Sequence, residues 1–588
     1  MKKTFVLKRT TEIKSNRKDD RHPISLTHEK NKDDDNLRII PLGGCEEVGK
    51  NMTVFEYKKD ILILDMGIQF PEEDMLGIDF VIPNIEYLKG KEKNIQGVVF
   101  SHGHLDHIGA ANILLKKLGN PPIIGRPLTI EMIKHRQEDS SKGSSKALKT
   151  IYIKNIEDKM QFGPFNLSFF KIDHSILDAV GTIIETPVAT VIHPGDWMIE
   201  HGPAGRSRVE YTNLAKLRKP TILMLESLGS TNSKKQVTES QMLDNLHSLI
   251  SSAPGRTIIA TFSSQLQRIG QILEYASKIG KKVALDGFSM KLNVEIAKKL
   301  GYIKPIKGTM IKIDKINDYP DNKVIIICTG SQGEEMSVLS RIVTKSHRFI
   351  NLKKNDTVIL SSSVIPGNEK VIQRLKDGIY RLCDNVYHSD IMAVHASGHS
   401  NRSDIQEIIK QINPTYFIPV YANHFMLKEA AKIAYKIGFS KDKVFVPDNG
   451  SIIQFNRSGA KILKEKAPAD YVFVDGLGVG DIGEIVLRDR QILAKDGMFV
   501  IIVTVRKNSG KICNSPDIIS RGFVYLRESK NLLAETRRKT THIINSAASS
   551  GNAVNWSSVK NEIKNKIGDF LYIKTQRRPI VLPVIIEV

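Results

Sequence analysis

Three histidines and one aspartate lie within six residues, His102-Gly103-His104-Leu105-Asp106-His107. Alternate residues of an extended segment point the same way, so His102 and His104 can bind one ion. Asp106 and His107 follow as the chain turns into a helix, and they can reach a second ion nearby. Imidazole and carboxylate together suit zinc or manganese. The spacing therefore predicts a metal site rather than three solvated histidines.

The segments that must position this loop read as short strands alternating with helices. The loop itself follows the apolar run GVVF and precedes an amphipathic pattern, ANILLKKLG. From about residue 215, runs such as TILMLES, GRTIIATF and KVIIICTG alternate with helical patterns, which is typical of a doubly wound parallel sheet. A last unit begins near Gly497, after the glycine-rich VDGLGVGDIG, and ends in the strand-like PVIIEV.

The composition favours a polyanionic partner. The 588 residues carry a net charge of +22, with a pI near 9.5, which suits nucleic acid, although a lysine-rich proteome would give the same charge. Four separated cysteines without a CxxC pair argue against a disulfide framework and a thiolate zinc site. No run of about 18 apolar residues predicts a membrane span, and no signal peptide is evident, so we expect a cytoplasmic protein.

The loop HGHLDH resembles the signature of the metallo-β-lactamase fold, and the rest of the chain resembles one branch of that fold, the bacterial ribonuclease J family. The resemblance runs from about Leu37 to Val588. Ordered segments carry it, among them PLGGCEEVGKNMT, HPGDW, ATFSSQLQR, CTGSQGEEMSVLSRI, HASGH and KTQRRPIVLPVIIEV.

This resemblance implies an α/β protein of three domains that binds RNA. We expect a metallo-β-lactamase αββα sandwich into which a doubly wound β-CASP α/β domain is inserted, followed by a small α/β dimerisation domain. The expected limits are 1–36 for a disordered tail, 37–214 and 375–465 for the sandwich, 215–374 for the insert, 466–496 for a linker and 497–588 for the C-terminal domain. The tail has a second interpretation as an RNA-contacting arm. The expected partners are RNA with a 5′-monophosphate end and a second subunit, in a homodimer, a tetramer or a hetero-oligomer with a ribonuclease J homologue.

The family pattern assigns metal-binding roles to seven positions. His102, His104 and His174 resemble ligands of a first ion, Asp106 and His107 ligands of a second, Asp196 the carboxylate that bridges them, and Tyr421 stands at the last position. Zinc is the expected ion, with manganese or magnesium as alternatives. Two such ions polarise a phosphodiester and lower the pKa of a bridging water. Asp65 resembles a carboxylate that orients a metal-bound histidine. Asp475, with the backbone near Leu76 and Ile78, matches a structural cation site of some members.

The same pattern supplies catalytic and substrate-binding candidates. Asp106 and Asp196 are the expected catalytic carboxylates, and His399 is the group expected to protonate the leaving oxygen. The segment His395-Ala396-Ser397-Gly398-His399 corresponds to the phosphate-binding motif, although HASGHS alone would be interpreted as a polar turn. The remaining candidates are Ser264, Gln265 and Leu266, where the family contacts substrate, and Glu226 at its acidic motif.

The sequence departs from the family most clearly at the second metal. Typical members read Pro-x-His-Gly-Glu, whereas this chain reads Pro419-Val420-Tyr421-Ala422-Asn423. A phenol, with a pKa near 10, is a poor ligand at neutral pH unless the metal deprotonates it. His424 lies three residues on and offers another imidazole. Milder departures are Leu105 for an acid, Gln267 for a histidine and Pro194 for a threonine.

These observations leave two hypotheses. The first is an active 5′-to-3′ exoribonuclease with endonuclease activity that serves RNA maturation and decay. The second is an attenuated paralogue, a weakly active or inactive RNA-binding subunit of a ribonuclease J hetero-oligomer. A small-molecule hydrolase is disfavoured by the β-CASP-like insert and by the charge of +22.

Overall fold

A computed structural model describes residues 35–588, apart from 202–209, 235, 335, 366, 482, 525–528 and 550–553. The prediction of a disordered tail over 1–36 therefore falls on residues outside this range, Asp35 and Asn36 excepted. Among the helices that are described, none is both long and apolar enough to cross a membrane.

Two sheets face each other in the part of the chain that carries the histidine loop. The first has the order β21-β20-β1-β2-β3-β5-β6-β7 and the second the order β19-β12-β11-β10-β9-β8. The strands of the first are β1 (Leu37–Gly43), β2 (Met52–Tyr57), β3 (Asp60–Leu64), β5 (Ile95–Val99), β6 (Ile123–Gly125), β7 (Thr150–Tyr152), β20 (Ser451–Asn456) and β21 (Gly459–Lys466). Those of the second are β8 (Lys159–Phe162), β9 (Phe165–Lys171), β10 (Val180–Glu185), β11 (Thr190–His193), β12 (Thr221–Glu226) and β19 (Tyr416–Val420).

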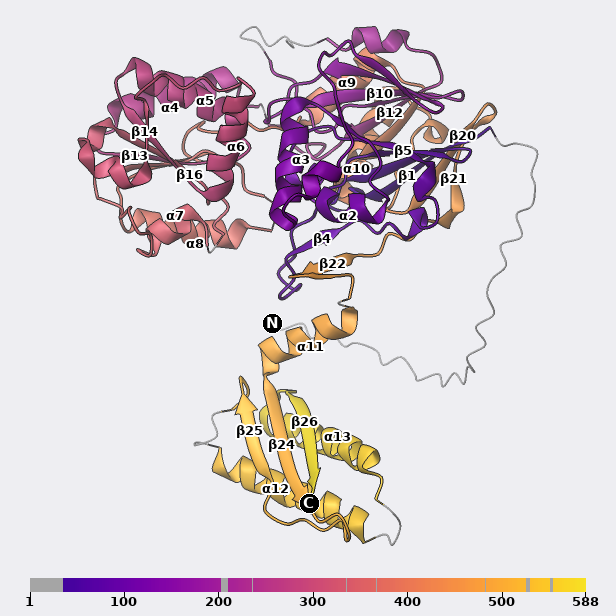
Figure 1. The fold of residues 1–588 in the computed structure, drawn as a ribbon, viewed down its shortest axis with the longest axis vertical. Helices are drawn as coiled ribbons and strands as arrows, with labels where there is room; N and C mark the ends of the chain where they lie inside the picture. Colours follow the sequence, from indigo (N-terminus) through magenta and orange to yellow (C-terminus); the bar gives the residue numbers. More distant parts are fainter. Residues whose placement is uncertain are drawn as a thin grey trace, which may run out of the picture. The chain divides into compact units, whose positions relative to one another are not determined.

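Apolar residues on both faces of each sheet produce four layers. Phe55 and Val99 of the first sheet share one core with Ile184 and Ile418 of the second. The outer face of the first sheet packs against α1 (Leu105–Ile108), α2 (Ala111–Lys117) and α3 (Pro127–Ser140). That of the second packs against α9 (Arg402–Ile412) and α10 (His424–Lys436). The helix-sheet-sheet-helix sandwich expected from the resemblance is therefore present (Figure 1).

A third sheet is parallel throughout, with the order β15-β14-β16-β13-β17-β18. Its strands are β13 (Thr257–Ala260), β14 (Lys282–Asp286), β15 (Met310–Ile311), β16 (Val324–Cys328), β17 (Thr357–Leu360) and β18 (Asn385–His388). One face is covered by α4 (Glu239–Ser252), α5 (Leu266–Lys278) and α6 (Phe288–Lys299), and the other by α7 (Val338–Val343) and α8 (Glu369–Tyr380) (Figure 1). Helices on both faces explain why the central strands β13, β16 and β17 are almost wholly apolar, and they confirm the doubly wound prediction.

Two small sheets complete the described chain. One has the order β23-β22-β4, built from β4 (Phe80–Ile82), β22 (Val472–Asp475) and β23 (Gly478–Val479). The helix α11 (Glu484–Asp496) leads from it to β24 (Met498–Val505), the centre of the other sheet. There β24 lies between β25 (Asp517–Arg521) and β26 (Ile580–Glu587), and one face is covered by α12 (Lys530–Ala548) and α13 (Trp556–Thr575).

Three segments differ from the predicted domain limits. Residues 221–226, expected in the insert, form β12, which pairs in parallel with β11 and β19 of the sandwich. Residues 385–388, expected in the sandwich, form β18 at the edge of the third sheet. The expected linker 466–496 contains β22, β23 and α11. Buried parallel strands look alike in sequence, so the sheet that each one joins depends on pairing that the local pattern does not reveal.

Candidate metal centre

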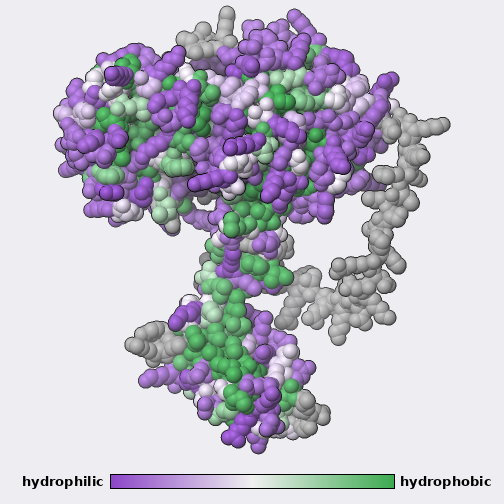
Figure 2. Space-filling view, viewed as in Figure 1, coloured by the Kyte–Doolittle hydropathy of each residue, from purple (hydrophilic) through white to green (hydrophobic). Residues whose placement is uncertain are grey.

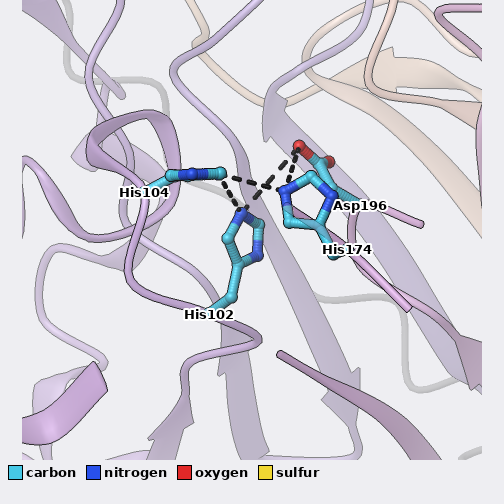
Figure 3. Close-up of side chains that lie close together, drawn as sticks. All are labelled: His102, His104, His174 and Asp196. Carbon is cyan, nitrogen blue, oxygen red and sulfur yellow. Dashed lines mark hydrogen bonds and ion pairs between the residues drawn. The ribbon is translucent and has the colours of Figure 1, made fainter. Parts of the chain in front are cut away.

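Four side chains from three loops meet at one point (Figure 3). His102 follows β5, His174 follows β9 and Asp196 follows β11, while His104 is the residue before α1. His102 Nε2 and His174 Nε2 each lie 3.0 Å from His104 Nδ1 and 3.9 Å from Asp196 Oδ2. The structure thus brings together all four side chains that the family pattern assigns to the first ion or the bridge.

The outer nitrogen of each ring has a protein acceptor. His174 Nδ1 donates to the carbonyl of Gly398 at 2.7 Å, while His102 Nδ1 and His104 Nε2 each lie 3.0 Å from a serine hydroxyl. These serines are Ser101 and Ser264. This pattern leaves the three inner nitrogens as lone pairs that face one another.

Such an arrangement fits a cation. Burial lowers the pKa of His104 to about 4 and that of His174 to about 3, so neither ring carries a charge at neutral pH. Lone pairs 3.0 Å apart repel unless a positive centre lies between them. Neutral imidazoles with a carboxylate are the donor set of a zinc-like ion.

A second group shares Asp196 with the first. His107 Nε2 lies 3.3 Å from Asp196 Oδ1 and 3.5 Å from Asp106 Oδ2. Asp196 thus offers Oδ2 to the first group and Oδ1 to the second, as a bridging carboxylate must. Burial disfavours a charged imidazole, but the carboxylates around it outweigh that effect and raise the pKa of His107. Its Nδ1 donates to Asp65 Oδ2 at 2.8 Å, a contact that fixes the direction of the ring.

The backbone that follows β3 packs closely against the HGHLDH loop and holds it in place. Asp65 has a φ of 63°, a left-handed conformation, at the end of β3. The following Gly67 lies against the carbonyl of Asp106, where an added Cβ would fall 1.5 Å from that oxygen. Only glycine therefore allows the chain after β3 to support the loop.

Tyr421 lies beside the second group, where it contacts His107 and the Asp65 carboxylate that binds this histidine. Its hydroxyl donates to Asp65 Oδ2 at 3.4 Å, and its ring lies edge-on to His107 with centroids 5.4 Å apart. Burial first, and then the Asp65 carboxylate, raises the pKa of this phenol well above its ordinary value. The phenol therefore stays protonated, and its hydroxyl donates a hydrogen bond to Asp65. The second group therefore consists of three side chains that could hold a cation, namely Asp106, His107 and Asp196.

Sequence reasoning missed three neighbours of the metal groups. Asn51 Nδ2 lies 3.0 Å from His107 Nε2 and 3.4 Å from Asp106 Oδ2. Ser101 connects Asp65 to His102 through its hydroxyl. His193, 1% exposed, lies against the Tyr421 ring with centroids 5.0 Å apart. Each of the three lies either within a segment that carries the family resemblance or directly beside the HGHLDH loop. That resemblance was the only sequence signal that could have found them.

An acid–base pair lies next to Asp196. His399 Nδ1 is 3.7 Å from Glu226 Oε2 and 3.9 Å from Asp196 Oδ2. Burial lowers the pKa of His399, but the carboxylates of Glu226, the nearer one, and Asp196 outweigh it and raise the value to about 9. Glu226 is 2% exposed and also accepts from the Leu228 N–H at 2.6 Å. A histidine that is protonated at neutral pH can act as a general acid.

The predicted substrate-binding residues divide into two groups. The hydroxyl of Ser264 contacts His104 and so lies beside the metal centre, while Gln265 directly precedes α5. Ser397 accepts from the His399 N–H at 3.1 Å, and the Gly398 carbonyl contacts His174. Leu266 and Ala396, in contrast, lie in the hydrophobic core beneath the third sheet, so their side chains do not line the site.

Two other predicted positions lie away from this centre. Asp475 Oδ2 pairs with the guanidinium of Arg490 at 2.5 Å, and Arg490 also donates to the Leu76 carbonyl at 3.0 Å. An arginine thus contacts two of the three positions predicted for the structural cation, Asp475 and the Leu76 backbone. His424 lies in an exposed cluster with Glu46 and Asp448, 3.6 Å from the Asp448 carboxylate, rather than at the second metal group.

Comparison with known proteins identifies the family. Four family profiles match the chain: Metallo-beta-lactamase superfamily over 46–209, Ribonuclease J, beta-CASP domain over 254–379, Zn-dependent metallo-hydrolase RNA specificity domain over 388–447 and Ribonuclease J C-terminal domain over 485–588. Ribonuclease J2 of Bacillus subtilis is 34% identical over 95% of this chain and 100% of its own length. Ribonuclease J 1 of Streptococcus pyogenes is 37% identical over 93% and 97%. The chain belongs to the ribonuclease J family.

Family membership confirms the resemblance, the fold class and the prediction of a ribonuclease J-like nuclease. This chain is a metallo-β-lactamase/β-CASP hydrolase, a nuclease acting on RNA phosphodiester bonds, and its family implies divalent metal ions. One solved structure, of a protein of unknown function from Enterococcus faecalis, shows the same fold. It matches with a TM-score of 0.50 and 16% identity, over 73% of this chain and 100% of its own.

Proposed function

We propose that this ribonuclease J-family chain works as a two-metal 5′-to-3′ exoribonuclease with endonuclease activity. The observation that carries the proposal is Asp196, which reaches the first group through one oxygen and the second through the other. His102, His104 and His174 would hold the first ion, and Asp106 and His107 the second. Zinc suits the three imidazoles, while manganese or magnesium would suit the carboxylate-rich second site.

In this proposal the residues of the chain divide the work of hydrolysis. Bound divalent ions supply Lewis-acid polarisation of the phosphodiester and a more acidic water. Asp65 holds the His107 ring, so that its Nε2 faces the second site. The backbone and hydroxyl of Ser397, with the neighbouring N–H groups of the HASGH loop, would hold a phosphate. His399 would donate its proton to the leaving oxygen, and Glu226 would keep that proton in place.

The direct test is cleavage of an RNA that carries a 5′-monophosphate. Purified protein with Mn²⁺ should release nucleotides from the 5′ end, and an RNA with a blocked 5′ end should be cut internally. Asp106→Ala serves as the matched control, because it removes a ligand from the half-exposed edge of the site. Cleavage that is absent, or equal in the control, contradicts the proposal.

A second candidate function rests on Tyr421. Because its hydroxyl is bound to Asp65, the second site has one ligand fewer than the family pattern. The chain would then serve as a weakly active RNA-binding subunit beside a homologous chain. Metal analysis separates the candidates: about two ions per chain favours the active enzyme, and one or none favours this alternative.

We expect the pH profile to depend on Glu226. A general acid works while it is protonated, so wild-type turnover should decline only as the pH rises toward the His399 pKa of about 9. Glu226→Gln removes the nearer carboxylate, so the pKa of His399 should fall and the alkaline decline should begin at lower pH. Single-turnover cleavage between pH 6 and 9.5 measures this, with Glu429→Gln, a partly buried ion-pair partner of Arg402, as the control. An unchanged alkaline limb in Glu226→Gln would show that the pair does not set it.

We also propose that the C-terminal sheet joins two subunits. Its helix-free face carries Val500 of β24 with its register partners Ile519 and Leu582, and Figure 2 shows hydrophobic residues gathered there. Leu582 is 50% and Ile586 45% exposed. A second copy, or a homologous chain, would cover this face with its own equivalent surface.

Charge on this face should therefore separate the subunits. Leu582→Lys is expected to convert the oligomer to a monomer at micromolar concentration, since a buried unpaired ammonium would oppose association. Ile573→Lys is the control, because Ile573 is 71% exposed on α13, on the opposite side of the sheet. Light scattering gives the mass of each; a wild-type monomer, or an unaffected Leu582→Lys oligomer, rules out this interface.

A further inference from the structure

Arg268 is a buried arginine that the metal centre does not use. It lies on α5 and is 1% exposed. Its NH1 donates to the carbonyl and to the hydroxyl of Ser361, each at 3.2 Å, and lies 3.1 Å from His395 Nδ1. Its NH2 pairs with Glu239 Oε1 at 3.3 Å. Burial of a guanidinium is costly unless its donors have acceptors, so each of these contacts constrains its partner.

The contact with His395 fixes the position of a proton. A guanidinium only donates, and it stays charged at every accessible pH. The Ser361 hydroxyl gives its own proton to the Val394 carbonyl at 2.7 Å, so its oxygen is free to accept from Arg268. His395 Nδ1 must accept likewise. A neutral imidazole that accepts at Nδ1 carries its proton on Nε2.

The same surroundings keep His395 uncharged. Burial first, and then the Arg268 charge, lowers the pKa of His395 to about 3. The charged or titratable groups that face it are Arg268 on α5, Glu239 on α4 beyond that guanidinium, and His399 in its own loop. The two histidines of HASGH therefore hold opposite states at neutral pH: His395 is neutral and His399 is protonated.

We propose that Arg268 is a positioning residue that holds His395 as a neutral Nε2–H donor for the substrate phosphate. The proposal rests on the proposed function, in which the HASGH loop binds a phosphate of RNA. A fixed tautomer presents one N–H in one direction and adds no charge beside His399. The donor then persists through the whole range in which His399 keeps its proton.

A matched control lies in the same domain. Arg256 is 2% exposed and pairs with Asp356 through Nε at 3.0 Å and NH2 at 2.6 Å. It also donates to the Asn351 carbonyl and contacts no histidine among the described residues. Replacement of Arg256 therefore reproduces the loss of a buried arginine without any change near HASGH.

The tautomer can be read without RNA or metal. Full-length protein labelled with ¹⁵N-histidine is examined by long-range ¹H–¹⁵N correlation NMR from pH 5 to 8, with His395 assigned by its loss in His395→Gln. We expect an unprotonated Nδ1 and a protonated Nε2 throughout. In Arg268→Met this fixed pattern should give way to mixed tautomers or to titration, whereas Arg268→Lys and Arg256→Met should retain it. A proton on Nδ1 in the wild type, or an unchanged pattern in Arg268→Met, overturns the proposal.

RNA affinity then tests the consequence. With EDTA present to prevent cleavage, anisotropy of a labelled 5′-monophosphorylated oligonucleotide gives Kd. Arg268→Met should weaken binding about tenfold, close to the loss in His395→Gln, while Arg268→Lys should retain most of the affinity. Equal affinity in Arg268→Met and the wild type overturns the positioning role. A wild-type chain that binds no RNA contradicts the proposed function itself, and the tautomer measured without RNA keeps these failures distinct.

Discussion

Replacement of Asp196 by asparagine is expected to abolish RNA hydrolysis and to release metal from both groups. The carboxylate offers one oxygen to His102 and His174 and the other to His107, so its loss affects each set at once. An amide retains the shape but supplies no negative charge to balance two divalent ions. Single-turnover cleavage should fall by a factor on the order of a thousand or more. Inductively coupled plasma mass spectrometry should show both ions depleted.

Asp448→Asn provides the matched control for this result. Asp448 belongs to the other cluster whose geometry could hold a cation, with Glu46 and His424, but that cluster is exposed and Lys466 already pairs with Asp448 at 2.9 Å. Metal content and cleavage should therefore be unchanged. Loss of an ion in Asp448→Asn would place a metal in the exposed cluster, and normal cleavage by Asp196→Asn would refute the bridging role.

The sequence alone predicted the part of the centre that is local. HGHLDH places its ligands within six residues, so residue type and spacing suffice to predict them. His174 and Asp196 come from loops after different strands, and each alone is an unremarkable histidine or turn aspartate. Only the family resemblance singled them out, and the structure then brought their side chains to the loop.

The parts that escaped prediction depend on contacts between distant residues. Tyr421 and Asp65 lie 356 positions apart, so residue type showed that a phenol is a poor ligand but not which group its hydroxyl would contact. Arg268 and His395 are separated by 127 positions. The misplaced domain limits have the same origin, because the buried runs of β12 and β18 do not indicate which sheet each one joins.

The second large effect is a gain in affinity for the second metal ion, which we expect for Tyr421→His. Imidazole is neutral at physiological pH and has a lone pair that a phenol held protonated beside Asp65 does not offer. The substituted ring occupies the same left-handed backbone position, φ 56°, next to His107. A fourth protein ligand should tighten binding of the second ion by about 10- to 100-fold, the scale on which neighbouring groups alter metal sites. Cleavage at limiting Mn²⁺ should rise with it.

Tyr421→Phe separates this gain from mere loss of the hydroxyl. Phenylalanine keeps the ring against His107 and His193 but withdraws the proton donated to Asp65. It should therefore bind the second ion no better than wild type, and less well if the Asp65 contact helps to orient His107. Titration of Mn²⁺ followed by electron paramagnetic resonance measures both affinities. If the histidine and phenylalanine variants bind Mn²⁺ alike, Tyr421 does not occupy a vacated ligand position, and the second site is limited instead by Asn51, whose amide contacts both His107 and Asp106.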